Sequence, residues 1–347
     1  MMRLHVDIKK KLPDFSLEVC FENKEGVLGL LGASGAGKSL LLKCIAGIEK
    51  PDEGQIILND CVLFDSEKGI NVIPQKRKAG YLFQDYALFP NMNVYENIRC
   101  ILPKGVEGNL KTIKIIEQFD LGEIQKRYPA QMSGGEKQKT ALARIVASNP
   151  QLLLLDEPLS AMDSQLRFRM EEELKHTVRE LGIPTVLVTH NRDEAYRMCQ
   201  DIAVLKKGRI CELNSKEDIF NHPKTREAAF MTGCKNIASC KEAGRDNYEV
   251  PDWGISLSVP AGEFGLYVGV RMRKIKILNN PEENYNNNVF SGRIKDIIDE
   301  PFDRVVMVVP DGGRQALGIV VEKRTNFCVD DIVRFYISED GINLLSE

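Results

Sequence analysis

The segment that most constrains this chain lies near its start and matches the pattern G-x-x-x-x-G-K-[ST]. It follows the apolar run Val27–Leu31 and precedes a leucine-rich stretch, so the pattern predicts a strand, a tight loop and a helix. Glycines let backbone N–H groups turn inward around a polyphosphate, and the helix dipole adds to the attraction. Lys38 is expected to reach the outer phosphates and Ser39 to hold Mg²⁺. The predicted nucleotide-binding residues of the loop are Gly32, Ala33, Ser34, Gly35, Ala36, Gly37, Lys38 and Ser39.

A second segment, Leu152–Leu155, is a continuous apolar run that ends in two acidic residues, Asp156 and Glu157. Runs without alternation suit parallel strands buried on both faces, and open α/β sheets bind ligands at the carboxyl ends of such strands. Asp156 is expected to coordinate Mg²⁺ through water. Glu157 is expected to orient or deprotonate the water that attacks the γ-phosphate. Taken alone, this segment would equally suit a solvated strand end.

The alternation of short β-rich runs with helical stretches over the first 220 or so residues predicts an α/β domain with a mostly parallel sheet. Thr185–Val188 is a further predicted strand. A crossover helix is predicted before it, capped by Asp163 or Ser164 and ended by Gly182. From about Gly233 only short strand-like runs remain, among them Ile255–Val259, Leu266–Val270, Val305–Val309 and Ile332–Ile337. We therefore expect residues 231–347 to form a small all-β domain, a barrel of the OB type.

Composition narrows the classes of partner. Lys and Arg total 47 and Asp and Glu total 50, a net charge of −3, so the balance predicts no nucleic-acid partner. No apolar stretch approaches the ~18 residues that span a bilayer, and the first residues lack the apolar core of a signal peptide, which predicts a chain that stays in the cytosol. The nine cysteines are scattered without a C-x-x-C pair, which favours idle thiols over a metal site.

Further motifs complete a set. A predicted helix over Lys137–Ala147 is preceded by Ser133-Gly134-Gly135-Glu136. The acidic strand is followed by Ser160-Ala161-Met162-Asp163, and Gln84 lies in Phe83-Gln84-Asp85. His190 comes at the end of the strand that begins at Thr185. Together with the phosphate loop and the acidic pair, these motifs resemble, in order, those of ATP-binding cassette ATPases. The resemblance covers roughly residues 1–230. It implies a P-loop ATPase cassette with a helical signature subdomain over that range.

The resemblance also implies roles for single residues. Ser133, Gly134, Gly135 and Asp163 would contact ATP, and the signature of one copy would cover the γ-phosphate held by a second copy in a head-to-tail homodimer. His190 would contact the γ-phosphate. Gln84 would touch Mg²⁺ or water as well as a transmembrane partner, so the implied metal ligands are Ser39, Gln84 and Asp156. From the residues alone, Ser133 equally suits a helix cap, His190 a buried histidine and Gln84 a loop amide.

Two positions depart from the family pattern. Glu136 stands where glutamine is commoner, which adds a negative charge near a phosphate site and leaves its role open. The family also stacks adenine on an aromatic residue upstream of the phosphate loop. Phe15 is the nearest candidate here, although Phe15, Leu17 and Val19 equally suit the core face of a strand.

Local matches narrow the class of cassette. The local matches are residues 64–70, 80–85, 88–90 and 233–236 with Pro74 and Arg77. Together with the β-rich region 289–345 they resemble importer ATPases for oxyanions such as molybdate, which carry a regulatory β-domain (TOBE/Mop-like). That resemblance implies a peripheral subunit on the cytoplasmic face of the membrane, transmembrane permease subunits as partners, and indirectly an extracytoplasmic oxyanion-binding protein. Importers of sulfate, tungstate, sugars or polyamines share the plan. A soluble cassette ATPase of translation or DNA repair remains a remote alternative.

Overall fold

In the computed structural model the chain forms two compact units, Met1–Lys216 and Glu217–Glu347. The structure describes residues 3–24, 26–160, 162, 164–244, 246–259, 264–278, 285 and 287–347. Each unit has its own hydrophobic core. The domain boundary expected between residues 230 and 231 stays a prediction. Two helices lie around the stretch between residue 216, where the first unit ends, and residue 230. They are α7 (Lys216–Asn221) and α8 (Arg226–Met231).

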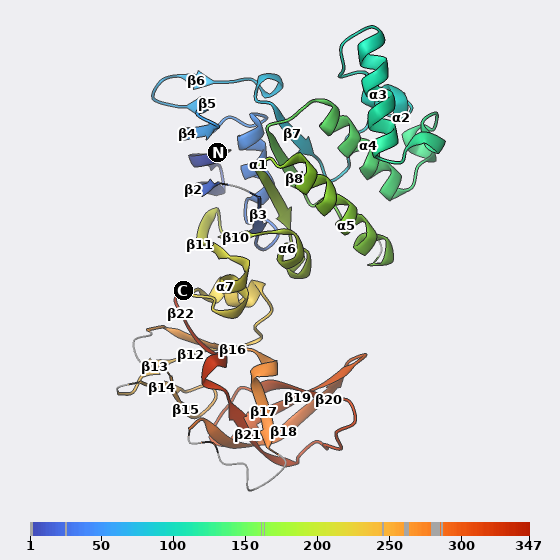
Figure 1. Ribbon diagram of the computed structural model, residues 1–347. Helices are drawn as coiled ribbons and strands as arrows, with labels where there is room; N and C mark the ends of the chain where they lie inside the picture. Colours follow the sequence, from blue (N-terminus) through green and yellow to red (C-terminus); the bar gives the residue numbers. More distant parts are fainter. Residues whose placement is uncertain are drawn as a thin grey trace. The chain divides into compact units, whose positions relative to one another are not determined.

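The first unit is built on one eleven-stranded sheet with the strand order β6-β5-β4-β1-β2-β11-β10-β3-β9-β8-β7 (Figure 1). Strands β3, β9, β8 and β7 run parallel, and β10 runs parallel to β3. The strands are β1 (Leu4–Leu12), β2 (Phe15–Asn23), β3 (Val27–Leu31), β4 (Glu53–Leu58), β5 (Cys61–Asp65), β6 (Ile70–Asn71), β7 (Ala79–Leu82), β8 (Leu152–Asp156), β9 (Thr185–Thr189), β10 (Asp201–Lys206) and β11 (Arg209–Ser215).

The sheet is mixed, which corrects the expectation of a mostly parallel one. β1 pairs antiparallel with both β2 and β4, and β4, β5 and β6 continue antiparallel. Short turns join β1 to β2 and β4 to β5, and such connections can only join antiparallel neighbours. On β1 the side chains of Leu4, Val6 and Ile8 are buried while Asp7 and Lys9 are exposed, the alternation expected of a strand with one solvated face.

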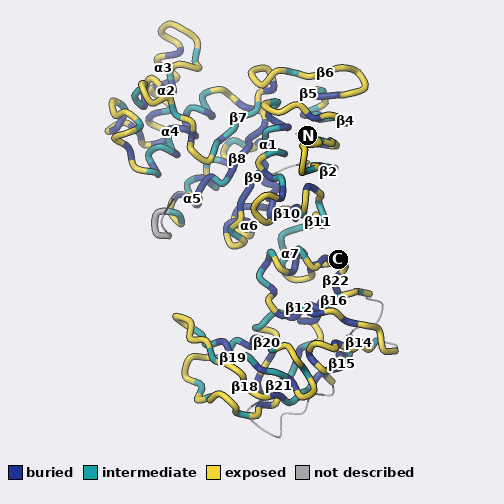
Figure 2. The backbone as a smooth tube through the Cα atoms, turned by 180° about the vertical axis from the view of Figure 1, so that it is seen from behind, coloured by how far each residue is buried: buried dark blue, intermediate teal, exposed yellow. Residues whose placement is uncertain are grey.

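The parallel strands form the buried centre of this unit, seen in dark blue in Figure 2. Every residue of β3, β8 and β9 is buried, which confirms the three strands predicted from apolar runs. The core joins these strands to β1, β2 and α1 (Lys38–Ala46). α1 ends at Gly47, whose φ of 79° suits glycine and lets its N–H bond the carbonyls of Lys43 and Cys44.

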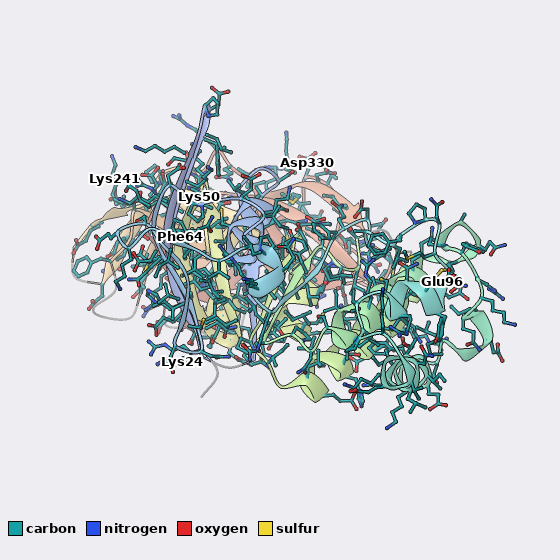
Figure 3. All side chains as sticks on the ribbon, turned by 90° about the horizontal axis from the view of Figure 1, so that it is seen from above. Lys24, Lys50, Phe64, Glu96, Lys241 and Asp330 are labelled. Atoms are coloured by element: carbon teal, nitrogen blue, oxygen red, sulfur yellow. The ribbon has the colours of Figure 1, made fainter. Side chains whose placement is uncertain are left out.

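A group of helices stands to one side of the sheet, beyond its edge strand β7 (Figure 1). In the view from above, Glu96 on α2 lies at this side of the molecule, far from Phe64 in the sheet (Figure 3). The helices and 3-10 turns of the unit, besides α1, are η1 (Pro74–Lys76), α2 (Val94–Arg99), α3 (Val106–Gln118), η2 (Gly122–Ile124), η3 (Pro129–Gln131), α4 (Gly134–Ala147), α5 (Ser164–Leu181) and α6 (Arg192–Met198).

Within its described residues, the second unit is all-β apart from its first helices and two 3-10 turns, η4 (Met272–Lys274) and η5 (Glu339–Gly341). Its largest sheet has the order β17-β21-β18-β19-β20, and the edge strands β17 and β20 contact each other, so the sheet is nearly closed. This confirms the small barrel-like domain. The strands are β12 (Asn236–Ser239), β13 (Lys241–Glu242), β14 (Asn247–Val250), β15 (Ile255–Ser258), β16 (Tyr267–Val270), β17 (Ile275–Leu278), β18 (Val289–Asp299), β19 (Asp303–Pro310), β20 (Leu317–Glu322), β21 (Ile332–Ile337) and β22 (Ile342–Leu345).

None of the helices in the described part of the chain is both long enough and apolar enough to cross a bilayer.

Candidate active site

Three neighbouring strands of the first unit end at the same edge of the sheet. Leu31 of β3 lies opposite Thr189 of β9, and Val188 of β9 lies opposite Asp156 of β8. The residues that follow these strands are therefore brought together. They are Gly32, Glu157 and His190, which come from three segments far apart in the sequence.

Gly32 and Gly37 show why the phosphate loop requires glycine. A Cβ at Gly32 would lie 2.4 Å from the carbonyl oxygen of Leu205, which is too close for any side chain. Gly37 caps α1 with a φ of 103°, and a Cβ there would also meet the ring of Phe15 at 2.7 Å. The loop thus passes close to β10 on one side and to Phe15 on the other. Phe15 is half-buried against the core beside the loop, so it serves the strand face while lying next to the predicted nucleotide site.

Lys38 points back across the loop. Its Nζ donates hydrogen bonds to the carbonyl oxygens of Gly32, at 2.7 Å, and Ala33, at 2.9 Å. Burial lowers the pKa of the Lys38 ammonium, and the charges of Glu157 and Asp156 oppose that shift. The ammonium is therefore held at the mouth of the loop in reach of both acidic side chains, where phosphate oxygens would be strong acceptors.

Two of the three implied metal ligands lie together. The Ser39 hydroxyl donates to Asp156 Oδ1 at 2.8 Å, and the Tyr81 hydroxyl donates to Asp156 Oδ2 at 2.8 Å. Burial, together with the adjacent carboxylate, raises the pKa of Tyr81, which keeps it a hydrogen-bond donor. One hydroxyl and one carboxylate suit Mg²⁺, which takes oxygen ligands and commonly binds through one or two protein groups plus substrate phosphates. No cluster of three or more His, Cys, Asp or Glu that could hold a metal alone occurs in the described part of the chain.

Glu157 and His190 face each other across this edge. His190 Nδ1 lies 3.2 Å from Glu157 Oε2, and the His190 side chain is mostly exposed. The Glu157 backbone adopts a φ of 47°, a left-handed conformation that is unfavourable for a residue other than glycine. Its N–H donates to the carbonyl oxygen of Val188 at 3.0 Å, which ties the strained residue to β9. The strained backbone conformation of Glu157 thus directs its carboxylate toward the edge of the sheet.

Gln84, the third implied metal ligand, follows β7 and contacts the segment after β8 that carries Glu157. Its Nε2 donates to Ser160 Oγ at 3.5 Å, and Ser160 Oγ donates to the carbonyl oxygen of Glu157 at 3.0 Å. The structure therefore brings Gln84 to the segment that carries Glu157. The predicted ATP contact Asp163 lies outside the described residues.

The signature residues begin α4, in the helical group apart from the phosphate loop (Figure 1). Ser133 caps the helix: its hydroxyl accepts from the Glu136 N–H at 3.3 Å, and the Glu136 carboxylate accepts from the Ser133 N–H at 2.7 Å. This reciprocal bonding starts the helix at Gly134, earlier than the predicted Lys137. Glu136 therefore helps to cap the helix. The hydrogen bond from the Ser133 N–H lowers the pKa of its carboxyl, and Arg127 lies 3.4 Å away.

Several contributing residues were missed by the sequence reasoning. Tyr81, Thr189 and Glu194 all hold groups at this edge through side-chain hydrogen bonds. Tyr81 reaches Asp156 because β7 pairs with β8 in the sheet, and nothing local to Tyr81 reveals that pairing. Glu194 could have been noticed as an acidic residue shortly after His190, at the start of the next helix.

Glu194 is almost fully buried on α6, and burial raises the pKa of its carboxyl to about 7 from a usual value of 4.5. The hydrogen bond from Thr189 and the charges of His190 and Arg167 act in the opposite direction, while Glu171 adds to the rise. Between those pH values the folded chain holds a proton that the unfolded chain releases. The resulting stability is present at low pH and is lost as the pH rises through about 7.

We therefore expect Glu194→Gln to be more stable than the wild type at about pH 8, by up to about 3 kcal/mol, and nearly equal to it at about pH 5. The amide stays neutral at both pH values and can still accept from Thr189. The measurement is the melting temperature of both proteins across this range. A difference between them that does not change with pH would show that Glu194 does not titrate on folding.

A glycine-rich loop opening a helix, a lysine at its mouth, and a serine–aspartate pair beside a strained glutamate at the ends of parallel strands together define a P-loop nucleoside triphosphatase. Comparison with known proteins then identifies the branch. A family described as "ABC transporter" matches residues 16–160. Import ATP-binding proteins of this family align with most of the chain, so the chain belongs to the ATP-binding cassette (ABC) transporter family and is an ATPase of its importer type.

The relatives come from several import systems. The molybdenum import ATP-binding protein ModC of Rhodospirillum rubrum is 31% identical over 75% of this chain and 70% of its own length. The spermidine/putrescine import ATP-binding protein PotA of Bacillus thuringiensis subsp. konkukian is 36% identical over 82% of this chain and 79% of its own. A solved dimeric cassette bound to ADP and Pi, MJ0796, superposes with a TM-score of 0.52 at 26% identity, over 62% of this chain and 99% of that one.

Proposed function

We propose that this ATPase, as a peripheral subunit on the cytoplasmic face of the membrane, hydrolyses MgATP to energise the uptake of an oxyanion, and that the oxyanion is molybdate. The observation that carries the hydrolytic part is the pair formed by Glu157 and His190, 3.2 Å apart, beside the Ser39–Asp156 hydrogen bond. A carboxylate and an imidazole at that position suit the orientation and deprotonation of an attacking water.

The proposed roles follow from the geometry of each group. The N–H groups of residues 32–39 and the ammonium of Lys38 would bind the phosphates of ATP, exchanging the carbonyl partners of Lys38 for phosphate oxygens. Ser39 and Asp156, with Gln84 as the further candidate, would hold Mg²⁺, which when bound neutralises charge on the phosphates. Glu157 would take or orient the proton of the attacking water. His190 would contact the γ-phosphate through Nε2, because its Nδ1 faces Glu157.

A second copy of the chain is the partner we propose for the signature. Ser133, Gly134 and Gly135 begin a long helix, and such a helix start attracts phosphate groups. They lie in the helical group, apart from the phosphate loop of the same chain (Figure 1). The likeness to solved dimeric cassettes supports a head-to-tail pair in which each signature faces the nucleotide of the other copy.

Molybdate is supported by the local matches over residues 64–70, 80–85, 88–90 and 233–236 and by the molybdenum relative, whose alignment covers 75% of this chain. A polyamine is the second candidate, because the spermidine/putrescine relative aligns over 82% at higher identity. The deciding measurement is uptake by cells that carry either the wild-type chain or Glu157→Gln. We expect the variant to abolish molybdate uptake and leave spermidine uptake unchanged. Loss of spermidine uptake alone would favour the polyamine importer.

The loop after Gln84 is our candidate contact for the permease. Phe89 is 47% exposed and Leu88 is half-buried. The Phe89 backbone is fixed on both sides by Asn97 of α2, which accepts from its N–H at 2.9 Å and donates to its carbonyl oxygen at 3.2 Å. The ring lies 5.2 Å from the Arg144 guanidinium. A rigid loop that displays an apolar ring suits the docking of a permease helix.

We expect substitution of both Leu88 and Phe89 by Ser to abolish solute uptake while leaving the affinity for ATP within about twofold of wild type. The apolar side chains that we propose for the permease contact would be lost, whereas the phosphate loop is untouched. Ile73→Ser, which removes a similarly exposed apolar side chain elsewhere on the same unit, is the matched control and should import normally. Normal uptake by the double variant would mean that both side chains serve packing within the cassette.

Residues 231–347 are proposed to be a regulatory domain of the importer. Ser291, Arg293 and Lys295 alternate along β18, and the latter two are exposed, with Arg293 donating to the carbonyl oxygen of Asp330. This arrangement supports a solvated strand face, so we propose no ion site at these three side chains. Whether molybdate inhibits through this domain is tested by the ATPase activity of the assembled transporter across a molybdate series.

A further inference from the structure

We propose that Thr189 is a positioning residue for hydrolysis: its hydroxyl, held by Glu194, fixes the loop that carries His190 against Glu157. This inference rests on the proposed function, since it concerns how His190 is held for the same reaction. Thr189 is the last residue of β9, and His190 follows it directly. Both Thr189 and Glu194 are nearly inaccessible to solvent, so neither contacts the nucleotide from the surface.

The hydroxyl of Thr189 joins the two sides of the loop. Thr189 Oγ1 donates to Glu194 Oε2 at 2.7 Å and accepts from the Asn191 N–H at 3.0 Å. The Asn191 side chain in turn accepts from the N–H groups of Asp193, at 2.9 Å, and Glu194, at 3.3 Å. His190 thus lies between two residues that are bonded to each other and to the start of α6. Its backbone is therefore held on both sides, with the ring 3.2 Å from Glu157.

Burial of the Glu194 carboxyl lowers the stability of the fold, and its hydrogen bond with Thr189 offsets part of that cost. Its Oε1 has no hydrogen-bond partner among the described residues, and a buried, half-satisfied carboxyl lowers stability. The charged groups around it come from three elements: Glu171 and Arg167 of α5, His190 after β9, and Arg197 of α6, which pairs with Glu171 through both carboxylate oxygens. The Thr189 hydroxyl is the one hydrogen-bond donor to the Glu194 side chain in the described part of the chain.

The expected effect of losing this bond is on the chemical step. The His190 side chain is 62% exposed and lies 3.2 Å from Glu157, so we expect its position to depend on the backbone that carries it. A displacement of about 1 Å in a positioned group can cost as much as about a hundredfold in rate. The phosphate loop and Lys38 lie on other elements and keep their contacts. Binding of ATP should therefore be spared.

The test compares variants at Thr189 in the full-length chain. Thr189→Val removes the hydroxyl at almost constant volume, and we expect kcat to fall about tenfold or more with KM for MgATP and the Kd for ATP within twofold of wild type. Thr189→Ser keeps the hydroxyl and should recover kcat to within about threefold. Thr185→Val, which removes a buried hydroxyl from the other end of the same strand, is the matched control and should leave kcat unchanged.

A double-mutant cycle separates positioning from a general loss of structure. If Thr189 acts through His190, Thr189→Val should add no further loss of single-turnover rate to His190→Ala. The same fold-loss in both backgrounds, or a wild-type kcat in Thr189→Val, would overturn the proposal. Thr189→Ala, which also removes the hydroxyl, replaces the valine variant if that protein does not fold. A wild-type chain without ATPase activity would instead overturn the proposed function, and this inference with it.

Discussion

Replacing Glu157 by glutamine is expected to lower the kcat for ATP hydrolysis by at least about a hundredfold, because general-base assistance is typically worth 10²–10⁴-fold. The affinity for ATP should remain, since Lys38, the loop N–H groups and Ser39 are unaltered. The strained backbone at Glu157, with a φ of 47°, accepts glutamine as well as glutamate, so the variant should keep the loop in place. Phosphate release and equilibrium binding of ATP, measured on the same preparation, separate the two effects.

Glu172→Gln is the matched control for this prediction. Glu172 is an exposed acid on α5 that pairs with Lys175 at the surface, so removal of its charge should leave turnover unchanged. Retention of more than about a tenth of the wild-type turnover by Glu157→Gln would count against Glu157 as the main catalytic carboxylate. In that case His190, which lies 3.2 Å from Glu157, becomes the candidate base.

Replacing Lys38 by alanine is expected to weaken ATP binding itself, by about ten- to a hundredfold. The ammonium is positioned at the mouth of the loop by the carbonyls of Gly32 and Ala33, and a hydrogen bond to a charged group is worth about 1.5–3 kcal/mol. Its removal also leaves the charges of Asp156 and Glu157 uncompensated next to the phosphates. Titration with ATP in the presence of Mg²⁺ measures the loss.

Lys50→Ala provides the control for the loss of a positive charge. Lys50 is exposed after the end of α1 and is labelled in Figure 3, and it lies outside the loop. It should bind ATP as the wild type does. An unchanged affinity for ATP in Lys38→Ala would remove Lys38 from the phosphate site and would require another cation to face the nucleotide.

The local sequence pattern predicts structure correctly where the interacting residues are neighbours in the sequence. The phosphate loop is one example, since the strand before Gly32, the glycine turns and the helix from Lys38 are all consequences of a short stretch. The strand that ends at Asp156 is another, because an apolar run without alternation is typical of a strand buried on both faces. The Ser133 and Glu136 spacing is also a local signal for a capping box, which a comparison of Glu136 with the family pattern alone does not reveal.

The rest depends on the order of strands in the sheet. Tyr81 meets Asp156 because β7 is the neighbour of β8, and Ser39 meets Asp156 because the carboxyl edge of β8 lies near that of β3. Neither pairing leaves a trace near the residues themselves. The mixed character of the sheet has the same origin: short apolar runs specify strands but not their directions. Antiparallel pairing is imposed by short turns such as those between β1 and β2, β4 and β5, or β10 and β11.

A structure of Glu157→Gln with MgATP would show directly how the nucleotide is held, since this variant should bind ATP without turning it over. We expect phosphate oxygens within hydrogen-bond distance of Lys38 Nζ and the loop N–H groups, Mg²⁺ on Ser39 Oγ, and Ser133 of a second copy against the γ-phosphate. A nucleotide bound elsewhere, or a γ-phosphate that Lys38 and a second copy both leave untouched, would contradict this expectation.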